Sequence, residues 1–208
     1  GQHSPTNEDY LLRICEASHE LGKPIHYRMD HRRNAYMIGN LLDHGPTIIE
    51  VPQSEELHLV REARDYFYYR PEGVRSWGGP GRPPEGLDEV NQHTYPAWWN
   101  KTGVLMIQVE TLNAINNIPD FSMDGVDCFS WGPADLSIDR AAHPEHPFAK
   151  TDDTAIEHAV KLSKENGKQL CIRSYDRTLR NRYFDMGATI LMEVQSLDGQ
   201  LDKNLPFG

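Results

Sequence analysis

The sequence predicts an α/β protein built around a parallel β-sheet, and three observations support this prediction. Short β-rich segments alternate with helix-like segments along the chain, an order typical of βα units. The expected strands are apolar on both faces, as in a sheet that is covered by helices on both sides. Six such strands are counted, which is enough for one sheet in a chain of 208 residues.

The number of strands leaves two architectures open. Six strands suit a doubly wound sheet, whereas a closed (β/α)8 barrel needs eight. Hydrophobic periodicity does not distinguish between them. The strands are expected at residues 24–29, 47–52, 103–110, 126–131, 169–174 and 188–194.

Helix signals follow several of these strands. After the second strand, Ser54 is a candidate N-cap, and Glu55 and Glu56 favour the first turn of a helix. Before the fifth strand, Thr151 is a candidate cap for a segment with early acids, late lysines and a terminating Gly167. Both segments are therefore expected to be helical.

A long connection separates the second and third strands. Residues Tyr69–Thr102 are rich in Gly, Pro and aromatic side chains and are expected to form a loop. A loop of this length inside a compact domain is usually functional. We expect it to act as a lid or as a contact between subunits.

Composition limits the classes of function. The formal net charge of −10 and the pI of about 5.4 argue against nucleic acid as a partner, because a phosphate backbone requires a basic face. No apolar run approaches the roughly 20 residues needed to span a bilayer, and no signal peptide is recognised. Cys15, Cys128 and Cys171 are far apart and are expected to be free thiols in a reducing cytoplasm.

Polar side chains lie where several strands are expected to end, the edge at which parallel sheets carry their chemistry. Arg28 lies near the end of the first strand, and Glu110 ends the third, with Gln108 on the same strand face. Asp135 lies in the turn "GPADLS" after the fourth strand. Two carboxylates at neighbouring strand ends suit Mg²⁺ or Mn²⁺, and an arginine nearby suits an anionic oxygen.

Each of these residues also has a structural interpretation. A glutamate at a strand end is often solvated or paired with lysine, Arg28 alone reads as a surface or salt-bridged arginine, and Asp135 is a candidate helix cap. His3, in a leading loop, reads as an exposed histidine. The histidines of "HPEH" (143–146) do not form a convincing zinc site, because no third ligand is evident.

Several strings resemble one known family. "GVLMIQVETLNAINNI" followed by "GVDCFSWGPADLS" resembles the HpcH/HpaI aldolase and citrate lyase family, in which a strand ending Q-x-E-T is followed about 25 residues later by a strand ending G-P-[AN]-D-L-S. "HYRMDHRRNAYMIGNLLDHGPTIIEVPQSEE", "YYRPEGVRSW" and "GQHSPTNED" resemble further segments of the same family. The resemblance runs from residue 1 to about residue 195.

The resemblance implies a TIM-type (β/α)8 barrel that uses Mg²⁺, Mn²⁺ or Co²⁺ to handle pyruvate enolate. It implies cleavage or formation of a 4-hydroxy-2-oxo acid, with pyruvate and an aldehyde as the small-molecule partners, without a Schiff-base lysine. It also implies a homo-oligomer, while the composition points to a cytoplasmic protein that engages neither nucleic acid nor membrane.

The resemblance also assigns roles to residues of this sequence. Glu110 and Asp135 would bind the metal, and Gln108 would line the same pocket. Arg28 would contact the keto oxygen, and His3, oriented by Asp43, would be the general base. The backbone around Gly132, Ala134 and Asp135 would bind the pyruvate carboxylate, because a Gly-Pro bend at a helix start turns amide N–H groups toward an anion.

Departures from the family pattern leave alternatives open. The family's first two strands would precede His3 and are missing, so residues 1–208 are expected to be one barrel domain that is incomplete or completed by a partner. Gln2 stands where the family usually has Glu, and Arg173 lies in a strand that is usually more apolar. The alternatives are an acyl-CoA lyase of the citrate lyase type and a catalytically silent homologue that serves as a binding or assembly module.

Overall fold

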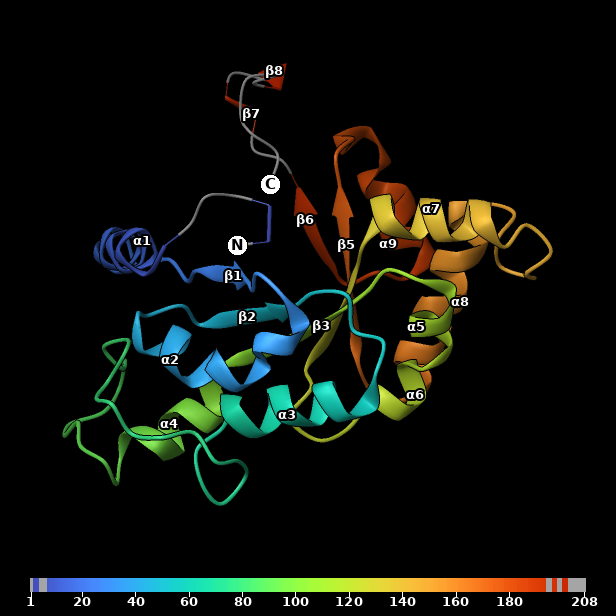
Figure 1. Cartoon of the computed structure of the whole chain (residues 1–208). Helices are drawn as coiled ribbons and strands as arrows, with labels where there is room; N and C mark the ends of the chain where they lie inside the picture. Colours follow the sequence, from blue (N-terminus) through green and yellow to red (C-terminus); the bar gives the residue numbers. More distant parts are fainter. Residues whose placement is uncertain (1, 4–6, 194–195, 198–199, 202–208) are drawn as a thin grey trace. The chain divides into compact units, whose positions relative to one another are not determined.

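The structure is a computed structural model, and it describes residues 2–3, 7–193, 196–197 and 200–201 (Figure 1). It confirms the α/β class, with strands and helices alternating along the chain. The chain divides into two compact units. Unit 1 contains residues 1–52 and 56–106, and unit 2 contains residues 53–55 and 107–208.

The main sheet has six described strands, and their order in the sheet is the order of the chain. The pairs β1–β2, β4–β5 and β5–β6 are parallel. A separate antiparallel pair, β7 and β8, was not predicted from the sequence. The strands are β1 His26–Arg28, β2 Ile48–Val51, β3 Val104–Val109, β4 Cys128–Trp131, β5 Gln169–Ser174, β6 Ile190–Glu193, β7 Ser196–Leu197 and β8 Gln200–Leu201.

The strand order decides between the two architectures that the sequence left open. A doubly wound sheet reverses its strand order at a switch point, whereas the strands of a (β/α)8 barrel follow one another in chain order. The order β1 to β6 without reversal is therefore of the barrel type. Six parallel strands are described, so closure into an eight-stranded barrel is not part of the observed fold.

The helices fit most of the sequence predictions and correct three. The helix α1 was not predicted, α4 lies inside the expected loop Tyr69–Thr102, and α3 begins after Glu56 without a cap from Ser54. The helices are α1 Glu8–Glu20, η1 Arg32–Met37, α2 Ile38–Asp43, α3 Leu57–Phe67, α4 Tyr95–Thr102, α5 Leu112–Asn116, α6 Ile118–Phe121, α7 Pro133–Ala142, α8 Asp152–Glu165, η2 Arg177–Leu179 and α9 Arg180–Met186.

Helix α4 forms because its sequence supplies both a start signal and a buried face. Pro96 stands in the first turn, where its missing N–H costs nothing, and Tyr95 and Trp99 are fully buried. The Trp99 indole N–H donates to the Phe67 carbonyl at the end of α3, 3.0 Å away. Burial of large aromatic side chains thus overrides the loop-like composition of this segment.

Unit 1 also contains a buried cation enclosed by aromatic rings. The Arg75 side chain has no exposed surface and donates to Asp43 Oδ1 at 2.7 Å. Its guanidinium carbon lies 4.6 Å from the ring centroid of Tyr69 and 4.7 Å from that of Trp99. Burial raises the pKa of the Tyr69 hydroxyl to about 12, although the Arg75 charge opposes that rise. Asp43 and the two rings therefore offset part of the desolvation of Arg75, whose Nε and Nη1 are buried without an acceptor among the described residues.

Replacing this arginine is expected to destabilise unit 1. We predict that Arg75→Met lowers the free energy of unfolding by roughly 3 kcal/mol, the low end for a broken buried ion pair, because Asp43 keeps 32% of its side chain exposed. Arg13→Met is the matched control, since the Arg13–Asp9 pair is 78% exposed on both sides and is expected to change stability by less than about 0.5 kcal/mol. Urea unfolding followed by tryptophan fluorescence measures both, and equal effects would contradict the prediction.

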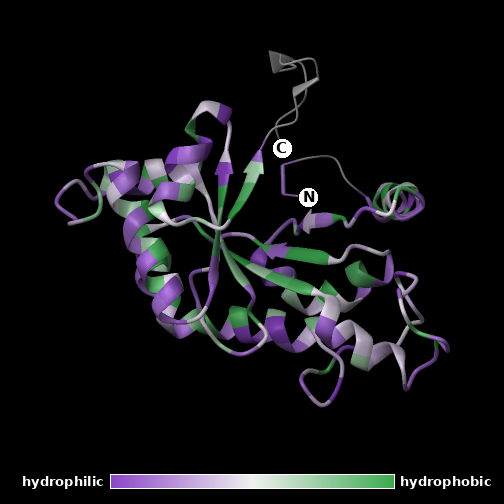
Figure 2. Ribbon diagram, turned by 180° about the vertical axis from the view of Figure 1, so that it is seen from behind, coloured by the Kyte–Doolittle hydropathy of each residue, from purple (hydrophilic) through white to green (hydrophobic). Residues whose placement is uncertain are grey.

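Unit 2 is built on the second half of β3 and on strands β4 to β6. Helix α8 packs on β5 and on α5, α6 and α9. Its N-terminus confirms the prediction for Thr151, which forms a capping box with Thr154. In Figure 2 much of the six-stranded sheet is hydrophobic, although β1 and the end of β5 are hydrophilic, and the helices alternate between hydrophobic and hydrophilic residues.

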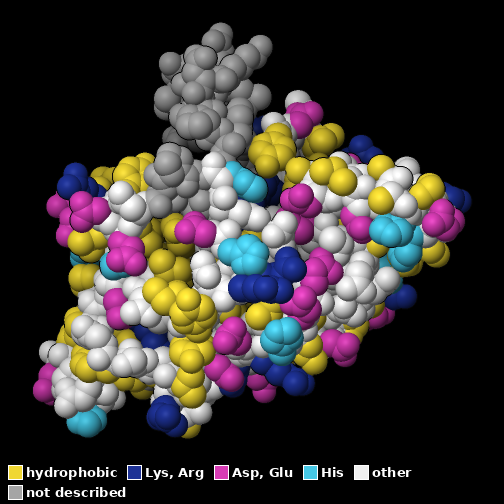
Figure 3. Space-filling view, viewed as in Figure 1, with side chains coloured by type: hydrophobic (Ala, Val, Ile, Leu, Met, Phe, Trp, Pro, Cys, Tyr) yellow, Lys and Arg dark blue, Asp and Glu magenta, His cyan; other side chains and the backbone are white. Residues whose placement is uncertain are grey.

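The surface and the helices agree with the charge analysis. On the face drawn in Figure 3, Lys and Arg side chains lie among Asp and Glu and do not form a continuous basic stripe. None of the described helices combines the length and the apolar character that crossing a bilayer requires.

The three cysteines are free, as predicted, and all three are buried. Burial raises the pKa of the Cys15 thiol to about 11, although the Arg82 charge opposes part of this rise. Because the thiolate is the reactive form, we expect Cys15 to react with iodoacetamide at pH 8 at least ~100-fold more slowly in the native protein than in urea. Mass spectrometry of the Cys15 peptide measures the rate, and equally fast labelling in both states would contradict a protonated, buried thiol.

Candidate active site

Buried polar side chains interrupt the apolar strands at one end. Glu50 is the third residue of β2, Gln108 the fifth of β3, Ser130 the third of β4 and Ser174 the last of β5, and Glu110 directly follows β3. All five are buried, with at most 3% of their surface exposed. Because buried polar groups are costly unless they are bonded, the four that belong to unit 2, at or near the carboxyl ends of β3, β4 and β5, indicate a site there.

The end of β3 carries the two predicted residues Gln108 and Glu110. Glu110 is 3% exposed, and its Oε1 accepts the backbone N–H of Gln53 at 2.8 Å. Gln108 is 1% exposed, and its Oε1 is buried and accepts no hydrogen bond from any described residue. A buried acceptor without a donor is unfavourable in the isolated chain, and it marks a place for a ligand that donates or for a cation.

Gly132 lies directly against these two side chains. A Cβ at position 132 would lie 2.5 Å from Glu110 Cβ, 2.6 Å from Glu110 Oε2 and 2.9 Å from Gln108 Nε2. The Gly132 N–H donates to the Val109 carbonyl at 3.1 Å, so the turn after β4 is tied to the end of β3. The close approach explains why glycine occupies this position, although its φ of −101° suits any residue.

The turn after Gly132 leads into α7, whose first turn contains Ala134 and Asp135. Gly132 is the N-cap, Pro133 begins the helix, and Asp135 is half-buried in its first turn, so Asp135 is not the cap. Pro133 has no N–H, and the first helical bond runs from Leu136 N to Gly132 O. Among the described residues, the N–H groups of Ala134 and Asp135 have no acceptor, and both lie at the positive end of the helix dipole.

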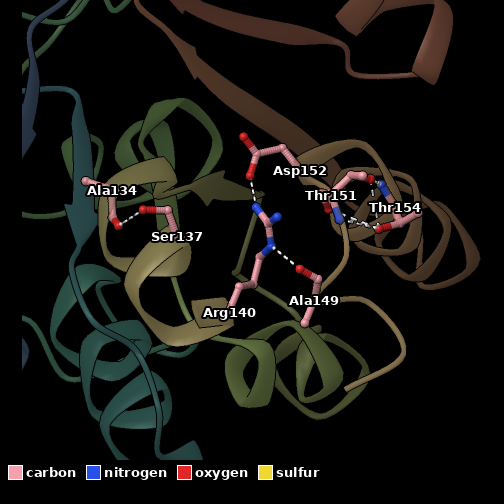
Figure 4. Close-up of polar contacts among 7 residues, drawn as sticks. All are labelled: Ala134, Ser137, Arg140, Ala149, Thr151, Asp152 and Thr154. Atoms are coloured by element: carbon pink, nitrogen blue, oxygen red, sulfur yellow. Dashed lines mark hydrogen bonds and ion pairs between the residues drawn. The ribbon is translucent and has the colours of Figure 1, made fainter. Parts of the chain in front are cut away.

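The rest of α7 is held in place by polar contacts of its own (Figure 4). Ser137 Oγ donates to the Ala134 carbonyl at 2.9 Å. Arg140 Nε donates to the Ala149 carbonyl at 3.1 Å, and Arg140 also forms an ion pair with Asp152. The Arg140 contacts therefore tie the C-terminal part of α7 to the start of α8 and the segment before it.

Asp139, on the same helix, reaches the segment that follows Glu110. Its Oδ2 accepts the Leu112 N–H at 2.8 Å, in the first turn of α5. Thr111 caps α5 by accepting the Ala114 N–H at 3.0 Å. The Thr111 hydroxyl also donates to Glu55 Oε1 at 2.6 Å. The backbone that directly follows Glu110 is therefore anchored at both Thr111 and Leu112.

Three further predicted residues lie in unit 1. Arg28 is half-buried at the end of β1 and pairs in register with Glu50 of β2. The Glu50 carboxylate is fully buried, and its Oε2 lies 3.0 Å from His26 Nε2. Asp43 pairs with Arg75, whereas His3 is exposed in a turn. The orientation of His3 by Asp43 stays a prediction.

Sequence reasoning missed several residues that shape the site. Asp139 and Glu55 accept hydrogen bonds from residues that are distant from them in sequence. Gln53 contributes its backbone N–H, which the residue type does not reveal. Glu50 gave one signal that was overlooked, because a charged residue inside the apolar run "TIIEVP" requires a partner once the strand is buried. The spacing of "HYR" and "IIEV" does not identify His26 as that partner, because the register between the strands sets it.

The donors at the end of β3 fit a hard divalent cation better than zinc. Within the described part of the chain, no group of three or more His, Cys, Asp or Glu residues is arranged to hold a metal ion. Structural and catalytic zinc sites use three or four such ligands, whereas Mg²⁺ commonly takes one or two carboxylates and leaves its other positions to water and substrate. The donors at the end of β3 are of the kind that Mg²⁺ uses. Glu110 is a buried carboxylate, Gln108 Oε1 is buried without a donor among the described residues, and Asp135 is a second carboxylate.

The strand order places the chain in the parallel α/β class, in which functional groups lie at the carboxyl ends of the strands. The comparisons with known proteins are more specific. The family model of the HpcH/HpaI aldolase/citrate lyase family matches residues 20–191, so the chain belongs to this family. The chain is 30% identical over 191 residues to a 4-hydroxy-2-oxo-heptane-1,7-dioate aldolase of Escherichia coli, covering 90% of this chain and 71% of that protein. The predicted class, a carbon–carbon lyase of the aldolase type, is confirmed.

Solved structures agree with the fold. An HpcH/HpaI aldolase from Desulfitobacterium hafniense superposes with a TM-score of 0.78 at 22% identity, over 92% of this chain and 73% of that chain. Macrophomate synthase superposes with a TM-score of 0.75 at 21% identity, over 92% of this chain and 68% of that chain.

Adding a side chain at Gly132 is expected to disturb the end of β3. We predict that Gly132→Ala lowers the free energy of unfolding by roughly 3 kcal/mol, because its Cβ would overlap Glu110 and Gln108. Gly167→Ala is the control, since a Cβ there meets nothing within 4 Å and only the left-handed φ of +69° is unfavourable, at roughly 1 kcal/mol. Thermal unfolding measures both variants, and a smaller effect at Gly132 than at Gly167 would contradict the steric argument.

Proposed function

We propose that this chain cleaves a 4-hydroxy-2-oxo acid to pyruvate and an aldehyde, and that Glu110 and Asp135 hold a divalent cation, Mg²⁺, Mn²⁺ or Co²⁺. The observation that supports this most directly is the packing of Gly132 against Glu110 and Gln108. That packing joins the end of β3 to the turn that carries Asp135. A bound cation would act as a Lewis acid, polarising the keto group of the substrate.

The chain's own residues account for the remaining needs of the substrate. The N–H groups of Ala134 and Asp135 are suited to the pyruvate carboxylate, because they lack helical acceptors and lie at a helix N-terminus. The Gly132 N–H already donates to the Val109 carbonyl and is not available to the substrate. Gly132 instead leaves space for the Glu110 and Gln108 side chains, because it has no side chain of its own. Gln108 would hold a donor of the bound substrate or solvent through its unpaired Oε1.

The proton transfers follow from the reaction. A base removes the C4 hydroxyl proton, the C3–C4 bond breaks, and its electron pair forms the enolate while the aldehyde leaves. We assign the base to His3, oriented by Asp43, and we assign Arg28 to the enolate oxygen, where a guanidinium stabilises charge that develops in the transition state. Protonation at C3 then gives pyruvate. A TIM-type barrel that is incomplete in residues 1–208 or completed by a partner, a homo-oligomeric state and a cytoplasmic location belong to this proposal.

The proposal predicts the activity and its dependence on two acids. We expect retro-aldol activity with added Mg²⁺, Mn²⁺ or Co²⁺ on a panel of 4-hydroxy-2-oxo acids that includes 4-hydroxy-2-oxo-heptane-1,7-dioate. Glu110→Gln and Asp135→Asn are each expected to lower kcat/KM by at least ~100-fold. Glu157→Gln, on the exposed face of α8, is the matched control and is expected to leave activity unchanged.

Proton exchange separates the remaining alternatives. The methyl protons of pyruvate should exchange in D₂O when the metal is present, and Glu110→Gln should abolish that exchange. No exchange at saturating metal would reject the aldolase mechanism in favour of a silent binding module. Cleavage of acyl-CoA thioesters without activity on free oxo acids would instead favour a lyase of the citrate lyase type.

A further inference from the structure

Gln53 has an unusual backbone conformation in the segment that contacts the site. Its φ is +46°, and it is the only non-glycine residue with a positive φ in the described part of the chain. Residues with a Cβ avoid this left-handed region because the Cβ crowds the backbone. When such a residue persists in a buried segment, its surroundings must hold it there, and such strain is often found at functional sites.

The left-handed turn at Gln53 directs its N–H to the Glu110 carboxylate. The N–H donates to Glu110 Oε1 at 2.8 Å. A hydrogen bond from a backbone N–H to a carboxylate is stronger than one between two neutral groups. Glu110 Oε2 lies on the side of Gly132. The bond therefore fixes the rotation of the carboxylate that Gly132 faces.

The two residues after Gln53 attach to the same strand end. The Ser54 N–H donates to the Gln108 carbonyl at 3.3 Å. Glu55 accepts from the Thr111 hydroxyl at 2.6 Å and from Asn113 Nδ2 at 3.2 Å. The segment Gln53–Glu55 thus contacts the residues before, at and after Glu110. This pattern explains why it belongs to unit 2, although its neighbours on both sides in sequence belong to unit 1.

We propose that Gln53 is a positioning residue, whose left-handed backbone sets the Glu110 carboxylate for cation binding. This inference rests on the proposed function and adds a residue to it. The side chain of Gln53 is not required, because the donor is the backbone N–H. Only the ability of the residue at position 53 to adopt a positive φ matters.

A substitution series at position 53 tests this directly. Gly and Asn adopt the left-handed region readily, whereas Val does so with difficulty. Gln53→Gly and Gln53→Asn should therefore bind Mn²⁺ within ~2-fold of the unaltered protein. Gln53→Val should bind at least ~10-fold more weakly, as expected when a residue that orients a metal ligand is displaced. Mn²⁺ binding is measured by electron paramagnetic resonance, with circular dichroism to verify the fold.

Glu56→Val is the matched control. It places the same β-branched side chain three residues later, at an extended backbone with φ of −120° and no side-chain cap bond. It is expected to leave Mn²⁺ affinity unchanged. If Gln53→Val is folded and binds Mn²⁺ as tightly as Glu56→Val, or if Gln53→Gly and Gln53→Val weaken binding equally, the proposal is wrong.

A second measurement does not depend on metal or activity. In protein with ¹⁵N-labelled glutamine, the Gln53 amide proton should resonate downfield and move upfield in Glu110→Gln, because a neutral acceptor bonds less strongly. An unmoved Gln53 resonance would overturn the inference. If the unaltered protein does not bind Mn²⁺, the proposed function fails, and the amide resonance alone then decides whether Gln53 orients Glu110.

Discussion

The burial of the Glu110 carboxylate is the constraint on which the site depends. A carboxylate with so little exposure is tolerated only if hydrogen bonds or opposite charges replace the water it has lost. The Gln53 N–H supplies one replacement, at the cost of a left-handed backbone. Gly132 supplies the space, because any side chain there would overlap Glu110. The local geometry around β3 follows from satisfying this one group.

The same requirement couples elements that are distant in sequence. Asp139 of α7 accepts the Leu112 N–H, and Glu55 accepts the Thr111 hydroxyl, so the residues after Glu110 are fixed. The carbonyl groups of Gln108 and Val109, before Glu110, accept the N–H groups of Ser54 and Gly132. The helix that carries Asp135 is in turn anchored through Arg140. The cation site proposed above would need this rigidity, because small displacements of metal ligands weaken binding.

Unit 1 resolves a similar problem with different partners. Arg75 is buried against Asp43 and two aromatic rings, and Glu50 is buried against His26. Both are ionisable groups removed from water, and each lies close to a group of opposite or protonatable character. Local composition did not reveal either pair, because their members are 32 and 24 residues apart in sequence.

The sequence by itself determined the six strands of the parallel sheet, the cap at Thr151, the family and the residues at the strand ends, because these depend on local hydrophobic pattern and short motifs. The tertiary structure alone decided that the strands follow chain order, that Tyr95–Thr102 is a helix, and that Gln53 donates to Glu110. Strand order, aromatic burial and a backbone donor depend on which segments meet after folding. No single stretch of sequence encodes that information.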